Sequence, residues 1–421
     1  MSTTDEVRTH YDRFPYPTVV NLAIPQPLDH RRRRLSYLLG RREGDAIPRD
    51  AKIWVAGCGT QQATHWGLTC PDAQITATDL SEGVVTKAKG LATAMGVTNV
   101  TFETHDLMTS PPERDAFDLV VSTGVIHHLP SPEIGLSHLR EGLKPTGALQ
   151  LMVYGTAQRS PLAAIRRATA TMADPSMSQD QRYALAIHIL RTTLAAEDTC
   201  APVGKAALQM LAGMADDQSF VADALLHPLE QTYDIDGLLA LLGSAGFRHQ
   251  QWYQPSLWRL DSYLEDPQLV ARSHALPPED QWRVVYELAG LSAPLLEVLA
   301  VPADIPKPAP YTADERAGMR LQACTGARVV AIKDSTPVGE IDVASFEPDG
   351  ETIVGRPSAG YGSPRAWRLP SYVTPLLEAC DGTATAAEIA ARFDDTFGAQ
   401  AVLDLMGTLL PDDIGLLTPA W

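Results

Sequence analysis

The stretch Ile53-Trp54-Val55-Ala56-Gly57-Cys58-Gly59-Thr60 decides the fold, together with Ile75-Thr76-Ala77-Thr78-Asp79-Leu80 further along the chain. The first is an apolar run that breaks into a glycine turn, and the second is an apolar run that ends in an acid. A helix between them completes a strand–turn–helix–strand unit, which binds a nucleoside at the carboxyl ends of parallel strands. Glycines let the backbone approach a ligand closely, and a carboxylate accepts both ribose hydroxyls. The spacing therefore predicts a nucleoside cofactor.

Strand and helix signals alternate from residue 50 to residue 155, as in a doubly wound parallel sheet. A helix is expected after Ser81, which is a plausible cap, and another over 132–143, before Pro145 and Gly147. The further expected strands are 100–103, 117–122 and 148–154, and the pattern resumes with a helix at 233–242 and a strand at 250–253. The core is therefore predicted to be α/β and Rossmann-like.

Residues 157–228 carry only helical signals and interrupt this alternation. An insertion at this point would lie beside the carboxyl edge of the sheet, where open sheets have their active sites, and could form a lid. The alternative is a packing appendage that only enlarges the core.

A proline-rich passage from Val301 to Pro310 is interpreted as a linker to a small C-terminal α+β domain. Thr385 and Glu388 form a capping-box pattern there, and the order of helices and turns suggests a winged-helix-like module. The expected organisation is a cap segment at 1–45, a cofactor-binding core at 46–156, the insertion at 157–228, completion of the core at 229–300 and the C-terminal domain at 301–421.

The composition is that of an ordinary globular protein of 421 residues, with 45% hydrophobic and 20% charged residues. A net charge of −17 disfavours nucleic acid as a partner, and no apolar run reaches membrane-spanning length. Five scattered cysteines and an N-terminus without export features make the cytoplasm the expected compartment. Four consecutive arginines, Arg31 to Arg34, are interpreted as a solvated helix face.

Several motifs together resemble those of class I S-adenosylmethionine-dependent methyltransferases. They are Ala56-Gly57-Cys58-Gly59-Thr60, Asp79-Leu80-Ser81, Phe117-Asp118, Gly124-Val125-Ile126-His127-His128-Leu129 and Tyr11-Asp12-Arg13-Phe14-Pro15-Tyr16-Pro17. The resemblance is to a bacterial branch of that family and covers residues 5–260. It implies S-adenosylmethionine as cofactor and a methyltransferase activity.

The resemblance also implies roles for the residues that would bind the cofactor. Gly57 and Gly59 would pass under the methionyl portion, Asp79 would hold the ribose hydroxyls, and Asp106 would accept from the adenine amino group. The remaining residues of the implied set are Thr60, Leu80, Leu107 and Ser122, of which the two leucines would pack on the adenine faces. For Asp106 the alternative is an ordinary cap of the next turn.

Two departures from the family pattern concern the amino group of the cofactor. Val55 stands where the family usually has an acid, and Thr60-Gln61-Gln62 replaces its third glycine. The amino group would then need other acceptors, such as the Ser122 carbonyl or the Gln61 side chain.

His127 and His128 follow the fourth expected strand and would lie beside the transferred methyl group. Histidine titrates near neutrality, so either one could act as a general base or orient the acceptor, while the other bonds a backbone carbonyl. Candidate substrate-binding residues are Tyr11, Tyr16 and Tyr154, together with His227 and Glu230, which could bind a cationic acceptor or merely cap a helix. No metal is expected, because no third ligand accompanies His227 and Glu230.

Three functions remain open at this point. The first is methyl transfer to a nitrogen or oxygen of a small polar metabolite, such as an amino-acid-like compound, an amine or a guanidine. The second is methylation of a peptide or protein that the C-terminal domain recruits. The third is a catalytically idle protein that binds S-adenosylmethionine as a sensor. A homodimer is compatible with each.

Overall fold

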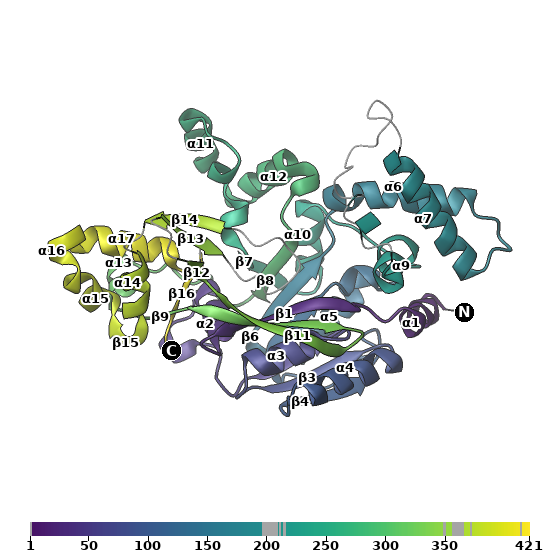
Figure 1. Ribbon diagram of the computed structural model, residues 1–421, viewed down its shortest axis with the longest axis horizontal. Coiled ribbons are helices and arrows are strands. Elements are labelled where there is room, and N and C mark those ends of the chain that lie inside the picture. Colours follow the sequence, from purple (N-terminus) through teal and green to yellow (C-terminus); the bar gives the residue numbers. More distant parts are fainter. Residues whose placement is uncertain are drawn as a thin grey trace.

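A computed structural model describes residues 2–195, 209, 212–213, 216–347, 351–355, 366–370, 373–412 and 415–421. Its centre is a seven-stranded sheet with the order β4-β3-β2-β5-β6-β8-β7 (Figure 1). The strands are β2 (Lys52–Ala56), β3 (Gln74–Asp79), β4 (Val100–Thr104), β5 (Phe117–Thr123), β6 (Leu143–Val153), β7 (Phe247–Trp252) and β8 (Leu296–Pro302). Strands β2 to β6 are parallel, and β8 is antiparallel to β6 and β7. The Rossmann-like core is thus confirmed as a mixed sheet.

Helices cover both faces of this sheet because successive residues of its strands point to opposite sides. On β2, Ile53 and Val55 pack in one buried cluster with residues of α3 (Gln62–Thr69) and α4 (Glu82–Ala94). Trp54 and Ala56 pack in a second cluster with α5 (Pro132–Gly142), α10 (Ile235–Ser244) and α12 (Pro278–Ala289). Helix α11 (Pro267–His274) precedes α12.

Strand β8 was not expected, and it corrects the predicted boundary at residue 300. The strand runs through Pro302, and its residues Val298 to Ala300 are fully buried between β6 and β7. A strand covered on both faces has no polar alternation, so a short apolar run beside prolines does not reveal it. The linker therefore starts after β8.

The N-terminal segment contains α1 (Thr3–Arg13), β1 (Val19–Gln26) and α2 (His30–Leu38). Strand β1 pairs antiparallel with β10 (Gly326–Lys333), and β10 pairs with β11 (Thr336–Ala344). Residues 1–45 and 301–421 therefore share a three-stranded sheet, which the predicted division into a cap segment and a separate domain did not include. Pairing between strands so far apart in sequence leaves no local signal.

The rest of the C-terminal region forms two small sheets and a group of helices. Strand β9 (Arg320–Ala323) lies between β15 (Asp381–Thr385) and β16 (Leu417–Pro419), and β13 (Glu351–Gly355) lies between β12 (Phe346–Glu347) and β14 (Ala366–Pro370). The helices are α13 (Ala313–Gly318), α14 (Val373–Ala379), α15 (Ala386–Arg392), α16 (Asp394–Phe397) and α17 (Ala399–Leu409). The predicted capping box of α15 is present. The pair Asp349-Gly350 predicts a hairpin turn, and these two residues lie outside those that the structure describes.

The arginines of α2 are buried rather than solvated, which corrects the sequence interpretation. Arg31 to Arg34 are between 4% and 7% exposed. Arg32 pairs with Asp29 at 2.8 Å and donates to the Trp421 carbonyl at 3.1 Å. Arg33 donates to Thr418 on β16 at 3.3 Å. Helix α2 thus joins the C-terminal strand to the core, a role that the sequence could not reveal because the partners are remote.

The insertion is helical, as expected. Its described helices are α6 (Thr156–Met172), α7 (Gln179–Ala195) and α9 (Gln218–Leu226), which share a small apolar cluster of their own. Figure 1 shows these helices at the opposite end of the molecule from α15 and α17. Among the described residues, no helix is long and apolar enough to cross a membrane.

We predict that Arg32→Ala lowers the free energy of unfolding by about 3 kcal/mol, because the carboxylate of Asp29 loses its ion pair of 2.8 Å and keeps only the longer pair with Arg33 at 3.9 Å. Urea denaturation measures the change. The matched control is Arg49→Ala, whose pair with Asp72 is exposed and whose loss costs less than about 1 kcal/mol. An equal decrease in the free energy of unfolding for Arg32→Ala and Arg49→Ala would contradict this role of Arg32.

Candidate active site

The glycine turn after β2 lies directly against the loop that carries the two candidate histidines. Gly57 and Gly59 have φ angles of +71° and +53°, which favour glycine. A Cβ atom on Gly57 would lie 2.3 Å from Val125 Cγ2, just before the 3-10 turn Ile126–His128. Only glycine at this position allows the two loops to meet.

Asp79 ends β3 and faces the glycine turn. Its carboxylate accepts from the Gly59 amide at 3.0 Å and from the Ser81 amide at 3.1 Å. Burial raises the pKa of Asp79 to about 6, against the opposing effect of these amide hydrogen bonds. A partly buried carboxylate at the end of this strand fits the predicted partner of two ribose hydroxyls.

The other residues that the resemblance assigns to the cofactor differ in burial and in hydrogen bonding. Ser122 is fully buried, and among the described residues its hydroxyl has no hydrogen-bond partner. Leu107 is buried, and Leu80 is half-buried. Asp106 accepts from the Met108 amide at 2.8 Å, which is the turn-capping alternative, although this bond uses one carboxylate oxygen. A buried hydroxyl without a partner, near a turn in which two residues are glycine, fits a polar nucleoside cofactor.

Thr60, which the resemblance assigns to the cofactor, forms hydrogen bonds with the N-terminal segment in this structure. Its amide donates to the Tyr16 carbonyl at 3.3 Å, and its hydroxyl donates to the Pro17 carbonyl. Thr60 therefore fixes the N-terminal segment over the glycine turn. The Tyr16 ring lies 6.2 Å from the Phe220 ring of α9, so this segment also reaches the insertion.

Four histidine rings pack together at the carboxyl ends of β5 and β6. The ring centroids of His127 and His128 are 4.2 Å apart, those of His128 and His227 are 3.7 Å apart, and those of His227 and His10 are 5.0 Å apart. The centroid of the Tyr154 ring lies 3.9 Å from that of the His127 ring. The structure thus brings together candidates from β5, β6 and the insertion, and adds His10, which the sequence analysis missed.

The two adjacent histidines differ in their hydrogen bonds. His128 Nδ1 lies 2.7 Å from the Leu229 carbonyl oxygen, so this ring makes the backbone contact expected of one of them. His127 is fully buried, and neither of its ring nitrogens has a partner among the described residues. Burial lowers the pKa of His127 and His128 well below the usual value, so both rings are neutral at pH 7.

Asp223 on α9 is a central residue of the site that the sequence analysis did not identify. It is 4% exposed, and it accepts from the Tyr11 hydroxyl at 3.1 Å and the Tyr154 hydroxyl at 3.5 Å. Burial raises its pKa to about 6, although Arg159 opposes this shift. The available signal was a single acid within the apolar run from Val221 to Leu226.

Glu230 does not present a free carboxylate to a cationic acceptor, which corrects that prediction. Its side chain is 3% exposed and pairs with Arg166 at 2.8 Å and with Arg159, both on α6. Arg159 also lies 4.1 Å above the Tyr154 ring. Glu230 therefore ties the insertion to the chain that returns to the sheet. Within the described part of the chain, no cluster of three or more His, Cys, Asp and Glu residues could hold a metal ion.

Residues 53–147 match the family model described as a methyltransferase domain. The chain contains an S-adenosylmethionine-dependent methyltransferase domain, and S-adenosylmethionine is its cofactor. The match includes the glycine turn, Asp79 and both candidate histidines.

Two curated relatives are similar to parts of the chain. An uncharacterized protein of Synechococcus sp. is 29% identical over 184 residues, which are 41% of this chain and 42% of the relative. A malonyl-[acyl-carrier protein] O-methyltransferase of Paenibacillus sp. is 32% identical over 109 residues, which are 25% of this chain and 40% of that one. The chain thus spans less than half the length of each.

The fold resembles that of a solved structure almost throughout. PKMT2 from Rickettsia typhi in complex with AdoHcy has a TM-score of 0.60 and 13% identity, and the match covers 92% of this chain and 75% of that one. The likeness therefore includes the sheet, the insertion and much of the C-terminal region at the level of the fold.

We predict that the affinity for S-adenosylhomocysteine (AdoHcy) falls about tenfold for each pH unit below the Asp79 pKa of about 6. The ionised carboxylate is the better acceptor for ribose hydroxyls, so protonation weakens binding. Calorimetry between pH 5 and pH 8 measures the effect.

In the same experiment, Asp79→Asn should flatten the pH profile and weaken binding by about 1.5–3 kcal/mol at pH 8. The exposed Asp72→Asn serves as the control and should behave as the unmodified protein does. An unchanged profile in a folded Asp79→Asn protein would remove Asp79 from the cofactor site.

Proposed function

We propose that the whole protein transfers a methyl group from S-adenosylmethionine to a nitrogen or oxygen of a small polar acceptor that lies beside His127. The bound cofactor supplies an electrophilic methyl group on a sulfonium. What the protein must add is alignment of a lone pair, exclusion of water and, for a protonated acceptor, removal of a proton.

The observation that carries this proposal is the hydrogen bond of 3.1 Å between Tyr11 on α1 and Asp223 on α9. It closes the N-terminal helix onto the insertion above the residues that follow β5 and β6. The Tyr11 ring lies 5.4 Å from the His227 ring, so this side chain borders the histidine cluster. Burial raises the pKa of Tyr11 well above its usual value, and the nearby carboxylates of Asp223 and Asp79 add to this effect. An enclosure of this kind favours a small acceptor over a folded protein.

The chemical roles follow from the protonation states of the side chains. His127 is neutral, so one of its two unpartnered ring nitrogens carries a lone pair that can accept a proton from the acceptor as the new bond forms. Asp223 and its two tyrosines can bind and orient polar groups of the acceptor. Glu230 pairs with both Arg159 and Arg166, so its single negative charge offsets one of their two positive charges, and the carboxylate of Asp223 interacts with Arg159 as well.

A transfer assay with S-adenosylmethionine labelled in its methyl group tests the proposal. The probes are the common amino acids, putrescine, spermidine, creatine and short carboxylic acids, followed by a mixed peptide digest. Label in a small compound supports the proposal. Label only in the peptides supports the peptide alternative, and cofactor binding without any transfer supports the idle alternative.

We predict that His127→Gln lowers kcat by about 10²–10⁴-fold with little change in AdoHcy affinity, because it removes a base but keeps the volume of the side chain. The exposed His274→Gln on α11 is the matched control and keeps full activity. If His127→Gln turns over normally, the acceptor loses its proton to another group.

We predict that Tyr11→Phe loosens α1, because Asp223 loses one of its two tyrosine donors. Backbone amides of Thr3–Arg13 should exchange with deuterated water about tenfold to a hundredfold faster, as expected for a lost hydrogen bond to a charged group. Tyr263→Phe, which loses a bond to the Leu257 carbonyl, is the control. Unchanged exchange in α1 would contradict the closure.

Deleting the C-terminal region is a poor test of the peptide alternative. Removal of residues 303–421 would leave β1 without β10 and would remove the Trp421 carbonyl that accepts from Arg32 and the Thr418 hydroxyl that accepts from Arg33. The predicted winged-helix character of this region remains part of that alternative. Point substitutions on its surface separate the two functions more cleanly than a truncation does.

A further inference from the structure

Strand β11 is the edge of the sheet β1-β10-β11, and it is unusually open. Every residue of β11 is exposed except Pro337, which is half-buried. Val338, Ile341 and Val343 expose 62%, 63% and 40% of their surface. An exposed edge strand presents backbone groups that can pair with another strand, and proteins usually shield such an edge.

The two faces of β11 differ in chemistry, as its register with β10 shows. Glu340 and Asp342 lie opposite Val330 and Arg328, on the face turned toward α3 and α4, where Val330 is buried beside Leu91. Ile341 and Val343 lie opposite Val329 and Ala327, on the other face. Arg328 on the same face pairs with Glu340 at 3.7 Å, so this acidic face carries two negative charges and one positive charge, whereas the other face is apolar.

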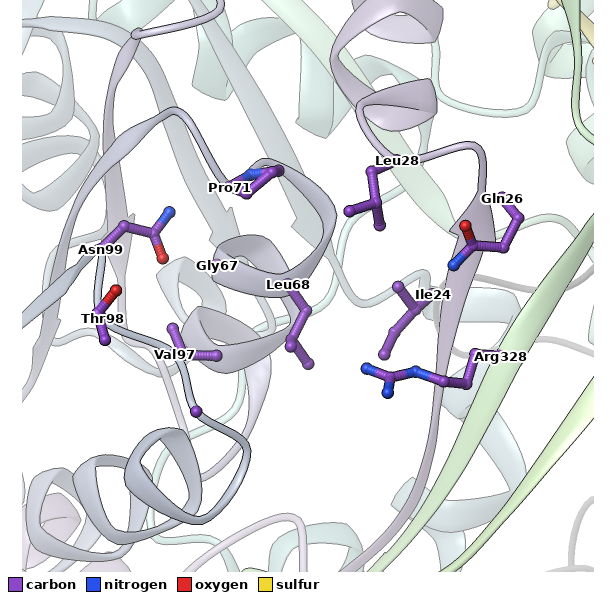
Figure 2. A pocket seen from close by; sticks show the side chains of 11 residues that line it. Ile24, Gln26, Leu28, Gly67, Leu68, Pro71, Val97, Thr98, Asn99 and Arg328 are labelled. Carbon is purple, nitrogen blue, oxygen red and sulfur yellow. The ribbon is translucent and has the colours of Figure 1, made fainter.

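Two hollows lie on the acidic face, and the one that β11 lines leaves room for side chains of a bound strand. One, of about 390 Å³, is lined by Val338 and Glu340 together with Met95 at the end of α4. The other, of about 440 Å³, lies between β1, α3 and the loop before β4, and Arg328 lines both. Figure 2 shows the Arg328 side chain extending from β10 toward Ile24 and Leu68.

We propose that β11 is the docking edge for an extended segment of a partner protein in which basic and apolar side chains alternate. Main-chain pairing along the edge would supply affinity, and the alternating side chains would supply specificity. Basic residues of the segment would meet Glu340 and Asp342 on one face, and its apolar residues would meet Ile341 and Val343 on the other.

Charge favours this occupant over a second copy of the chain. Two β11 strands paired antiparallel about a twofold axis would bring the acidic faces of both copies together, and like charges across strands are destabilising. The chain as a whole carries a net charge of −17, which also attracts a basic partner.

The position of β11 relates this edge to the methyltransferase site. At the tip of the β10–β11 hairpin, the Asp334 amide donates to the Thr18 carbonyl at 2.7 Å. Thr18 directly follows the segment whose Tyr16 carbonyl accepts from Thr60 in the cofactor turn. A docked segment would thus end close to the chain that covers the cofactor. Docking is a binding event, so its test does not depend on methyl transfer.

The experiment uses the full chain and a fluorescein-labelled octapeptide of alternating Lys and Val. Fluorescence anisotropy measures binding, and hydrogen exchange measures protection of residues 336–344. Two comparison peptides are an octapeptide of alternating Glu and Val, and a Lys-Val octapeptide with proline in place of alternate valines. The second keeps the charge but cannot pair fully as a strand.

The protein variant is the double substitution Glu340→Gln and Asp342→Asn. Its matched control, Glu265→Gln and Glu279→Gln, removes the same charge from exposed sites elsewhere. We expect the Lys-Val peptide to bind and to slow exchange in β11, with affinity about tenfold lower for the β11 variant and unchanged for the control.

Three results would overturn the proposal. If the proline-containing peptide binds as tightly as the Lys-Val peptide, and hydrogen exchange in β11 is not slowed, the binding is electrostatic adsorption alone. Equal or tighter binding of the Glu-Val peptide would contradict the charge argument. Self-association in sedimentation experiments, with β11 protected before any peptide is added, would assign the edge to a second copy of this chain.

Discussion

The absence of a side chain at Gly57 is the constraint on which the arrangement of the site depends. A Cβ atom there would lie 2.3 Å from Val125 Cγ2, so any other residue would separate the cofactor turn from the histidine loop. With glycine, the turn after β2 and the loop after β5 share one edge of the sheet. Asp79, Ser122 and His127 thereby follow or end neighbouring strands at the carboxyl edge of the sheet, where open α/β sheets bind their ligands.

Long-range contacts then enclose that region. Tyr11 reaches Asp223 from the N-terminal helix, and Thr60 holds the segment that follows this helix against the glycine turn. Glu230 pairs with Arg159 and Arg166, which fixes the insertion to the sheet. The N-terminal segment and the insertion are therefore held by polar bonds from three separate parts of the chain, each of which involves a buried group that would be costly to leave unpaired.

Several misses in the sequence interpretation share one physical cause. The arginines of α2 resemble a solvated face, because charged runs are usually exposed, yet Asp29, Thr418 and Trp421 compensate their burial. Strand β8 lacks alternation because both of its faces are covered. Asp223 sits in an apolar helix without a motif. Apart from the pair between Asp29 and Arg32, each depends on partners that are remote in sequence, so no local pattern could show them.

The sequence by itself determined the Rossmann-like core, the approximate positions of most of its strands and helices, and a nucleoside cofactor, because local periodicity and a glycine–acid spacing encode them. The resemblance to class I methyltransferases specified S-adenosylmethionine. It also indicated a helical insertion at the active-site edge. Only the tertiary structure decided that His128 bonds a backbone carbonyl while His127 does not, that Glu230 is already paired, and that β1 and β10 join the two ends of the chain. These features are contacts between distant segments, and the folded chain alone brings such segments together.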